Sequence, residues 1–252
     1  MTIEHPSPRR IPALRHLWQQ AFGDSDTFLD GFFRTGFAPE RCRCLVEADV
    51  PVAALYWFDA EYAGSRFAYM YAVATDPAFR GQGLCHRLMA DTHNLLAQLG
   101  YAGTLLVPAG DSLRNFYAGI GYHPFSTVRE FSVLAAGPAI PLRKLSAEAY
   151  ATLRRQYLPR AAVIQEGSTL DFLQTYGDFY AGEHCILTAV ADGSHLFVPE
   201  LLGDPACAPG ILQTLHAATG SFRCPGSGKS FAMALPFSGT PLPPGYFGLA
   251  LD

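Results

Sequence analysis

The sequence has no long hydrophobic run, no cluster of like charge and no dense cysteine pattern. Although 49% of its 252 residues are hydrophobic, no apolar stretch approaches the roughly 20 residues that span a bilayer. The first ten residues carry charge and proline but no apolar core, which disfavours a secretory signal. The six cysteines are thinly spread, which favours reduced thiols. These absences predict a cytoplasmic protein that does not act at a membrane.

Basic surface and metal ligands are also scarce. The formal net charge is −4 and no run of Lys and Arg occurs, which argues against a nucleic-acid partner held through phosphates. Cys42 and Cys44 have no second Cys or His pair at finger spacing. His86 and His93 are seven residues apart but lack a third ligand nearby. We therefore expect no metal site and no nucleic-acid partner.

Hydrophobic periodicity in the first half alternates between helix and strand spacing. Helices are expected at 12–37 with a break at Gly23, at 84–99 and at 111–119, and strands at 42–48, 52–58, 68–75, 104–108 and 126–134. This mixed order predicts an α/β (α+β) domain built on one sheet.

The second half repeats this pattern after a small-residue junction at 135–138. Helices are expected at 147–157, 169–176 and 210–218, and strands at 185–191, 195–201, 231–236 and 246–251. Thr75-Asp76-Pro77-Ala78 is echoed by Gly203-Asp204-Pro205-Ala206, each followed by a helix. A chance Asp-Pro pair is the alternative. We predict two domains, 1–134 and 139–252, with the second a degenerate repeat of the first.

The segment 71–85 (YAVATDPAFRGQGLC) has the features of an anion-binding loop. Gly81 and Gly83 carry no side chain that would block a ligand from the backbone N–H groups, and the helix after them directs its positive dipole end to the same place. The loop lacks the third glycine of a dinucleotide fingerprint and the Lys-Ser/Thr of a phosphate loop. We interpret it as a pyrophosphate cradle.

At this loop the chain resembles the GNAT N-acetyltransferase superfamily, whose signature is Q/R-x-x-G-x-G/A. Arg80, Gly83 and Pro77 match this pattern, and Cys85 departs from the usual Gly or Ala. The segment 115–122 (NFYAGIGY) is similar to a second superfamily signature. The expected arrangement, one intact GNAT unit followed by a degenerate one, resembles Eis-like acetyltransferases and N-myristoyltransferases.

The resemblance implies that acetyl-CoA binds as acyl donor, with its pantetheine arm against the third strand and its pyrophosphate on the loop. The expected cofactor contacts are Val73, Ala74, Thr75, Arg80, Gly81, Gln82, Gly83, Leu84, Cys85 and Asn115. It also implies that Tyr117 protonates the leaving thiolate, a role that suits a phenol at neutral pH. The alternative for Tyr117 is a packing aromatic on a short helix.

Attack on a thioester requires a neutral amine, so a base must take its proton. The strand at 68–75 has no carboxylate, which leaves Glu47 and Asp76 as candidates. In the tandem relatives the terminal carboxylate serves as base, and the chain stops at Asp252 after an apolar run. Asp252 is therefore a predicted catalytic residue through its α-carboxylate, and the plain end of a strand is the alternative.

The predicted function is transfer of an acetyl group from acetyl-CoA to a small-molecule or peptide amine by direct attack in a ternary complex. A non-catalytic acyl-CoA-sensing or protein-interaction module is the alternative. Asp24, Asp26 and Asp30 lie where superfamily members shape the acceptor site, although helix capping accounts for at least two of them. An exposed sheet edge is compatible with a homodimer.

Overall fold

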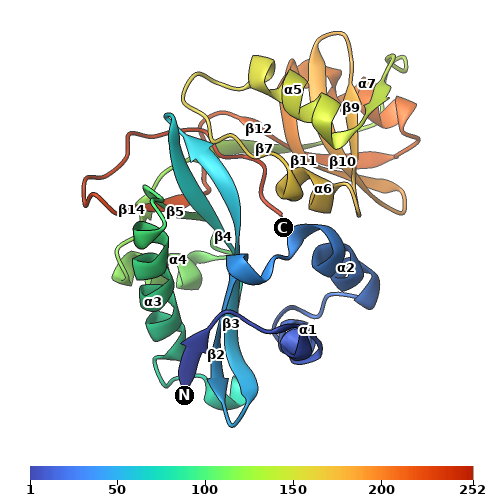
Figure 1. The fold of residues 1–252 in the computed structure, drawn as a ribbon. Helices are drawn as coiled ribbons and strands as arrows, with labels where there is room; N and C mark the ends of the chain where they lie inside the picture. The colour runs from blue at the N-terminus through green and yellow to red at the C-terminus, as the bar shows by residue number, and fades with distance from the viewer. Residues whose placement is uncertain (252) are drawn as a thin grey trace.

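Two seven-stranded sheets form the framework of the molecule (Figure 1). The computed structural model describes residues 1–251. The strand order is β1-β2-β3-β4-β5-β14-β6 in the first sheet and β13-β7-β12-β11-β10-β9-β8 in the second. The predicted mixed α/β architecture is confirmed.

The first 134 residues supply most of the first sheet and the helices on its two faces. The elements are β1 (Thr2–Glu4), α1 (Ile11–Phe22), α2 (Asp26–Gly31), β2 (Cys42–Glu47), β3 (Val50–Tyr62), β4 (Ser65–Thr75), α3 (Leu84–Gln98), β5 (Gly103–Leu106), α4 (Asp111–Gly119), β6 (His123–Pro124) and β7 (Thr127–Leu134). α3 and α4 cover one face, and α1 and α2 lie on the other (Figure 1). The apolar stripe of α3 buries Leu88 and Leu96 completely, which fixes this helix on the sheet.

The second half surrounds the second sheet with three helices. Its elements are β8 (Arg143–Leu145), α5 (Ala147–Tyr157), α6 (Ser168–Leu173), β9 (Asp178–Ala181), β10 (Cys185–Asp192), β11 (His195–Gly203), α7 (Ala208–Thr214), β12 (Thr219–Pro225), β13 (Lys229–Ser230) and β14 (Met233–Pro236). The prediction of a strand at 246–251 is wrong. Tyr246 forms a single bridge, to Ala162, and residues 247–251 have no strand partner. β12 lies in a stretch where the sequence indicated no element.

The two halves exchange strands. β7 pairs antiparallel with β12 in the second sheet, from Leu134 opposite Thr219 to Val128 opposite Pro225. In return, β14 pairs antiparallel with β5 in the first sheet, from Met233 opposite Leu106 to Pro236 opposite Gly103. The division of the chain into domains 1–134 and 139–252 remains a prediction. Each of the two sheets contains a strand from the other side of this boundary.

The halves also share one hydrophobic core. Phe28 of α2 lies 5.2 Å, ring centre to ring centre, from Phe172 of α6. Phe32 lies 5.3 Å from the same ring. These edge-on contacts bury apolar surface from both halves together, so the halves pack as one unit.

The repeated Asp-Pro turns have the same local geometry. Asp76 accepts a hydrogen bond from the Ala78 backbone N–H at 2.8 Å, and Asp204 accepts one from Ala206 at 2.9 Å. Each turn is a short 3₁₀ helix that precedes a longer helix, α3 or α7. A common origin for the two halves stays a prediction. The shared geometry of these two turns supports it at this one place in each half.

None of the helices formed by residues 1–251 has the length and apolar character needed to cross a bilayer. Within the same residues, no group of three or more His, Cys, Asp and Glu side chains is placed to hold a metal ion.

Candidate functional site

The first sheet opens between β4 and β5. These parallel strands pair only from Phe67 opposite Gly103 to Tyr69 opposite Leu105, whereas β4 continues to Thr75. One edge of β4 is therefore without a β5 partner beyond Tyr69, as an extended ligand would need in order to lie beside it.

A cavity of about 490 Å³ opens at this point, a size suited to a small molecule. Its described walls come from both halves and are mostly apolar and aromatic. They are formed by Trp18, Phe22, Asp24, Phe28, Tyr69, Met70, Tyr71, Ala72, Val73, Leu106, Val107, Pro108, Ala109, Leu113, Tyr117, Tyr176, Val190, Phe197, Ala250 and Leu251.

A backbone irregularity in β4 faces this cavity. Ala72 has a φ of 46°, which is in the left-handed region and costs roughly 1–2 kcal/mol for a residue with a Cβ. The pairing of β3 with β4 shifts register between Ala54 and Tyr56, opposite this residue. The irregularity redirects the last residues of β4 at the open edge. The sequence contains no signal for it, since nothing about an alanine predicts a positive φ.

The predicted cradle lies between the end of β4 and the start of α3. Gly81 and Gly83 have φ values of 75° and 72°, and a Cβ at either position would meet nothing within 4 Å. Gly83 is the N-cap of α3 and supplies no side-chain cap. The first N–H groups of the helix therefore keep their capacity to bind an anion. Arg80 Nε donates to the Thr75 carbonyl at 3.2 Å, which ties the loop to β4.

The other predicted cofactor residues fall into different environments. Leu84 is buried in the core beneath α3, so only its backbone is available to a ligand. Burial raises the pKa of the Cys85 thiol to about 11, which keeps it protonated and rules it out as a nucleophile at neutral pH. Gln82 and Asn115 are exposed, and neither is among the described residues that line the cavity.

Tyr117 lines the cavity from α4. The residue is 8% exposed, and burial raises the pKa of its hydroxyl, with a further contribution from Cys85 at the start of α3. That electrostatic contact brings the phenol next to the cradle, and the raised pKa keeps it protonated. No hydrogen bond joins the Tyr117 hydroxyl to another residue among 1–251. The structure thus places a protonated phenol, without a protein partner, on the cavity wall.

A polar group behind Tyr117 supports its position. The Tyr122 ring lies 5.7 Å from the Tyr117 ring, edge to face. The Tyr122 hydroxyl lies 2.7 Å from Thr104 Oγ1 and 3.0 Å from His93 Nε2. Burial lowers the pKa of His93 to about 4, so this imidazole is neutral at pH 7. The hydrogen bond to Tyr122 gives His93 a structural role between α3 and this polar group.

The depressed pKa of His93 predicts an acid-sensitive fold. Unfolded, this imidazole takes up a proton as the pH falls below about 6.5, whereas folded it stays neutral down to about 4. The unfolded state binds more protons in this window, so the free energy of unfolding falls as the pH falls. His93→Gln keeps a hydrogen-bonding group beside Tyr122 and removes the titration. Urea unfolding at pH 6.5 and 4.5 is expected to show a smaller loss of stability than in the parent. His86→Gln, at an exposed position on the same helix, is the control, and an unchanged loss in His93→Gln would contradict the assignment.

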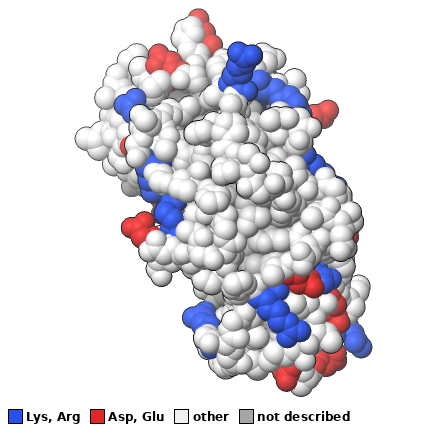
Figure 2. Space-filling view, turned by 90° about the vertical axis from the view of Figure 1, so that its left-hand side faces the viewer, with Lys and Arg blue, Asp and Glu red and all other residues white. Residues whose placement is uncertain are grey.

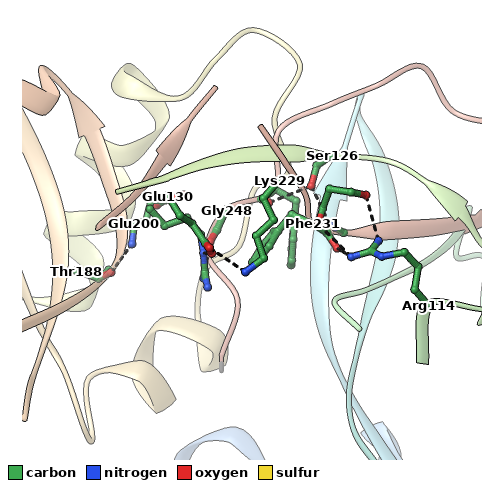
Figure 3. Close-up of polar contacts among 12 residues, drawn as sticks. Arg114, Ser126, Glu130, Thr188, Glu200, Lys229, Phe231 and Gly248 are labelled. Atoms are coloured by element: carbon green, nitrogen blue, oxygen red, sulfur yellow. Dashed lines mark hydrogen bonds and ion pairs between the residues drawn. The ribbon is translucent and has the colours of Figure 1, made fainter. Parts of the chain in front are cut away.

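The second half braces α4 and the first sheet. Arg114 Nη1 donates to Ser230 Oγ at 3.1 Å, and Arg114 Nη2 donates to the Phe231 carbonyl at 3.4 Å (Figure 3). Arg114 lies one helical turn before Tyr117, so the anchor steadies the helix that carries the phenol. These contacts and the cavity walls Tyr176, Val190 and Phe197 show that the second half forms part of the candidate site.

Residues 246–251 run between the two halves and end at the cavity (Figure 1). Buried side chains hold their backbone: Gln165 Nε2 donates to the Leu249 carbonyl at 2.9 Å, and Arg223 Nη1 donates to the Gly248 carbonyl at 3.3 Å. The Leu251 N–H donates to the Tyr69 hydroxyl at 3.2 Å. Figure 3 shows Gly248 close to the ion pair between Lys229 and Glu130.

A buried ion pair anchors the start of this segment. Arg154 donates to both carboxylate oxygens of Glu200, at 2.6 and 2.9 Å, and both side chains are at most 1% exposed. The Tyr150 and Tyr246 hydroxyls donate hydrogen bonds to the same carboxylate, at 3.0 and 3.1 Å. Because every partner is satisfied, the pair fixes where Tyr246 enters the interior.

The predicted bases are differently placed. Glu47 pairs with the N-terminal amine of Met1 at 3.2 Å, and Asp76 caps the turn after β4. Neither is among the described residues that line the cavity. Asp252 lies outside the described residues, so its role stays a prediction.

The three aspartates near α2 have separate roles. Ser25, not an aspartate, is the N-cap of α2, and its side chain accepts a bond from Phe28. Asp26 and Asp30 both pair with Arg15. Asp24 lines the cavity and accepts a hydrogen bond from Trp18 Nε1 at 2.7 Å. The expectation that capping explains at least two of the three is wrong, because a serine supplies the cap.

The face that carries α3 and α4 has no continuous patch of one charge. Figure 2 shows Lys, Arg, Asp and Glu gathered toward its two ends, with a broad uncharged area between them. An uncharged surface of this kind offers no electrostatic track for a nucleic-acid backbone.

Comparison with known proteins gives one family and one fold. Residues 2–125 match the family described as Acetyltransferase (GNAT) domain. The chain is similar to a GCN5-related N-acetyltransferase from Kribbella flavida, with 17% identity and a TM-score of 0.68 over 92% of this chain and 70% of that one. It is also similar to Eis1 from Mycobacterium abscessus, with 11% identity and a TM-score of 0.63 over 88% of this chain and 65% of that one.

A tandem GNAT protein from the clavulanic acid biosynthesis pathway matches over 96% of this chain and 99% of its own, with 11% identity and a TM-score of 0.58. A search of curated proteins gives no match. At these identities the solved structures establish the fold alone, whereas the family match covers the cradle and Tyr117. The resemblance inferred from Arg80, Gly83 and the 115–122 segment is confirmed. Residues 2–125 are therefore a GNAT acetyltransferase domain.

Proposed function

We propose that this protein transfers an acetyl group from acetyl-CoA to an amine, which attacks the thioester directly in a ternary complex. The observation that carries the proposal is the combination of three features, of which the second and third border the cavity. These are the uncapped start of α3 after Gly83, the edge of β4 without a β5 partner, and the buried phenol of Tyr117. The family match supports acyl transfer as the general reaction.

The residues present suit the parts of acetyl-CoA. The glycine loop and the first turn of α3 offer N–H groups and a positive dipole end for the pyrophosphate. The backbone at Val73, Ala74 and Thr75, on the open edge of β4, suits the amide-containing pantetheine arm. The mostly apolar cavity then receives the acyl group and limits the access of water to the thioester.

The proposed chemistry needs one acid and one base. The amine nitrogen forms a bond to the thioester carbonyl carbon, and the carbon–sulfur bond breaks. Tyr117 gives its hydroxyl proton to the departing sulfur, which is consistent with a phenol that stays protonated in its buried position. Asp252 remains the predicted base that takes the proton from the amine, because Leu251 before it lines the cavity.

The test is calorimetric titration with acetyl-CoA, followed by detection of free thiol with a panel of amines. We expect micromolar binding and amine-dependent release of CoA thiol. Binding without thiol release for any amine would instead support the non-catalytic acyl-CoA-sensing alternative. Absence of binding would refute both functions and mark the cradle as vestigial.

A further inference from the structure

Among residues 1–251, the cavity has one anionic anchor. Asp24 is the only carboxylate among its described walls, which contain no Lys, Arg or His. Unlike Asp26 and Asp30, which share Arg15, Asp24 forms no ion pair with any residue among 1–251. Its Oδ2 is held by the Trp18 indole N–H at 2.7 Å. This carboxylate is oriented but not neutralised, so it attracts a cation from the ligand.

Aromatic rings surround this anchor. The Trp18 ring lies 5.8 Å from Phe22 and 6.5 Å from Phe28, centre to centre, and all three rings line the cavity with Asp24. Phe22 is 47% exposed although it lies at the cavity. Ring faces beside a carboxylate stabilise an ammonium group, and exposed apolar surface favours an apolar ligand body.

From these features we propose that the acceptor is a diamine with an apolar body, whose distal ammonium binds Asp24 while its other amine reacts. The inference rests on the proposed function. A nitrogen held as ammonium by Asp24 has no lone pair for attack on a thioester, so the nucleophile must be a second nitrogen. One carboxylate anchors one cation, and the other described walls offer a polycation no further counter-charge.

Three probes with eight carbons each test the distal group: octane-1,8-diamine, octylamine and 8-aminooctanoate. The parent protein is expected to acetylate the diamine with a kcat/KM about tenfold above that of octylamine, since a cation near aromatic rings and a carboxylate gains roughly this much affinity. The aminooctanoate is expected to be the poorest acceptor, because its carboxylate would face Asp24.

Asp24→Asn is the decisive variant. Asparagine keeps an oxygen that accepts the Trp18 N–H bond and removes the charge, so the fold is expected to persist. The advantage of the diamine over octylamine should disappear, through a rise in the KM for the diamine. Asp26→Asn, which neutralises an exposed neighbour that is not among the cavity walls, should keep the ranking of the parent.

Other outcomes separate this inference from the proposed function. If no probe is acetylated but calorimetry shows diamine binding that Asp24→Asn abolishes, the diamine site at Asp24 is supported while the transferase function, and with it the role of the diamine as acceptor, fails. Equal use of the three probes, or an unchanged ranking in Asp24→Asn, overturns the inference. A fall in kcat with unchanged diamine binding also overturns it, because Asp24 would then act as a base.

Discussion

Replacement of Tyr117 by phenylalanine is expected to lower kcat by about 10²-fold or more, while the affinity for acetyl-CoA stays within about twofold. General acid catalysis contributes roughly 10²–10⁴-fold to such reactions, and Tyr117 carries a protonated hydroxyl on the cavity wall. Phenylalanine keeps the ring that packs on Tyr122 and removes only the proton donor. Steady-state kinetics and calorimetry on the same preparation measure the two quantities.

The control is Tyr157→Phe, which makes the same change at a residue that is not among the described cavity walls. It should leave both kinetics and binding unaltered. Full activity of Tyr117→Phe would contradict the catalytic role and leave Tyr117 as a packing aromatic.

The second large effect is expected at the cradle. Gly83→Glu should weaken acetyl-CoA binding by about 100-fold, because like charges placed together at an interface cost several kcal/mol and tenfold in affinity corresponds to about 1.4 kcal/mol. Gly83 precedes α3 with a φ of 72°, and a side chain at this position would meet no other atom within 4 Å of its Cβ. The new carboxylate would therefore stand at the helix N-terminus, where the pyrophosphate is expected.

Gly100 offers a matched control at the other end of the same helix. It follows α3 with a φ of 80° and equally open space around a Cβ. Gly100→Glu therefore imposes similar backbone strain, and both variants should unfold at similar temperatures. If Gly100→Glu weakens acetyl-CoA binding as much as Gly83→Glu does, the effect is one of stability and the cradle assignment is wrong.

The sequence predicted local elements well where their limits are set by local chemistry. α3 begins after Gly83, ends before Gly100 and carries a regular apolar stripe, and its observed limits of Leu84 and Gln98 agree with the prediction to one residue. β12 was missed because its seven residues, TGSFRCP, contain Gly, Ser, Arg and Pro. β12 is a strand because β11 and β7 pair with it on both sides, which no local pattern records.

At residues 246–251 the opposite happened: the sequence predicted a strand that the structure does not contain. A continuous apolar run indicates burial, and these residues are indeed buried. Their backbone groups, however, bond to Gln165 and Arg223 rather than to a neighbouring strand. These side chains, remote in sequence, provide the hydrogen bonds that a neighbouring strand would otherwise provide. Backbone groups of 246–251 are therefore hydrogen-bonded although the segment joins no sheet.

The candidate site shows a similar division. The glycine loop and Tyr117 were identified from short motifs, because their chemistry requires certain residue types at fixed spacing. The contributions of Tyr176, Val190 and Phe197 depend on how the second half packs against the first. The distinction between Asp24 and its neighbours depends on which of them Arg15 reaches, and only the three-dimensional arrangement decides that.

The strand exchange has a consequence for the order in which the protein can be completed during synthesis. The sheet that carries the cradle and Tyr117 cannot be finished until residues 233–236 have left the ribosome, because β14 covers the edge of β5. Until then β5 presents unpaired backbone groups to other nascent chains. A gene cut at the junction near residue 135 would yield two products, each missing a strand of its own sheet. The first sheet is therefore completed late, and only on a chain that also carries the second half.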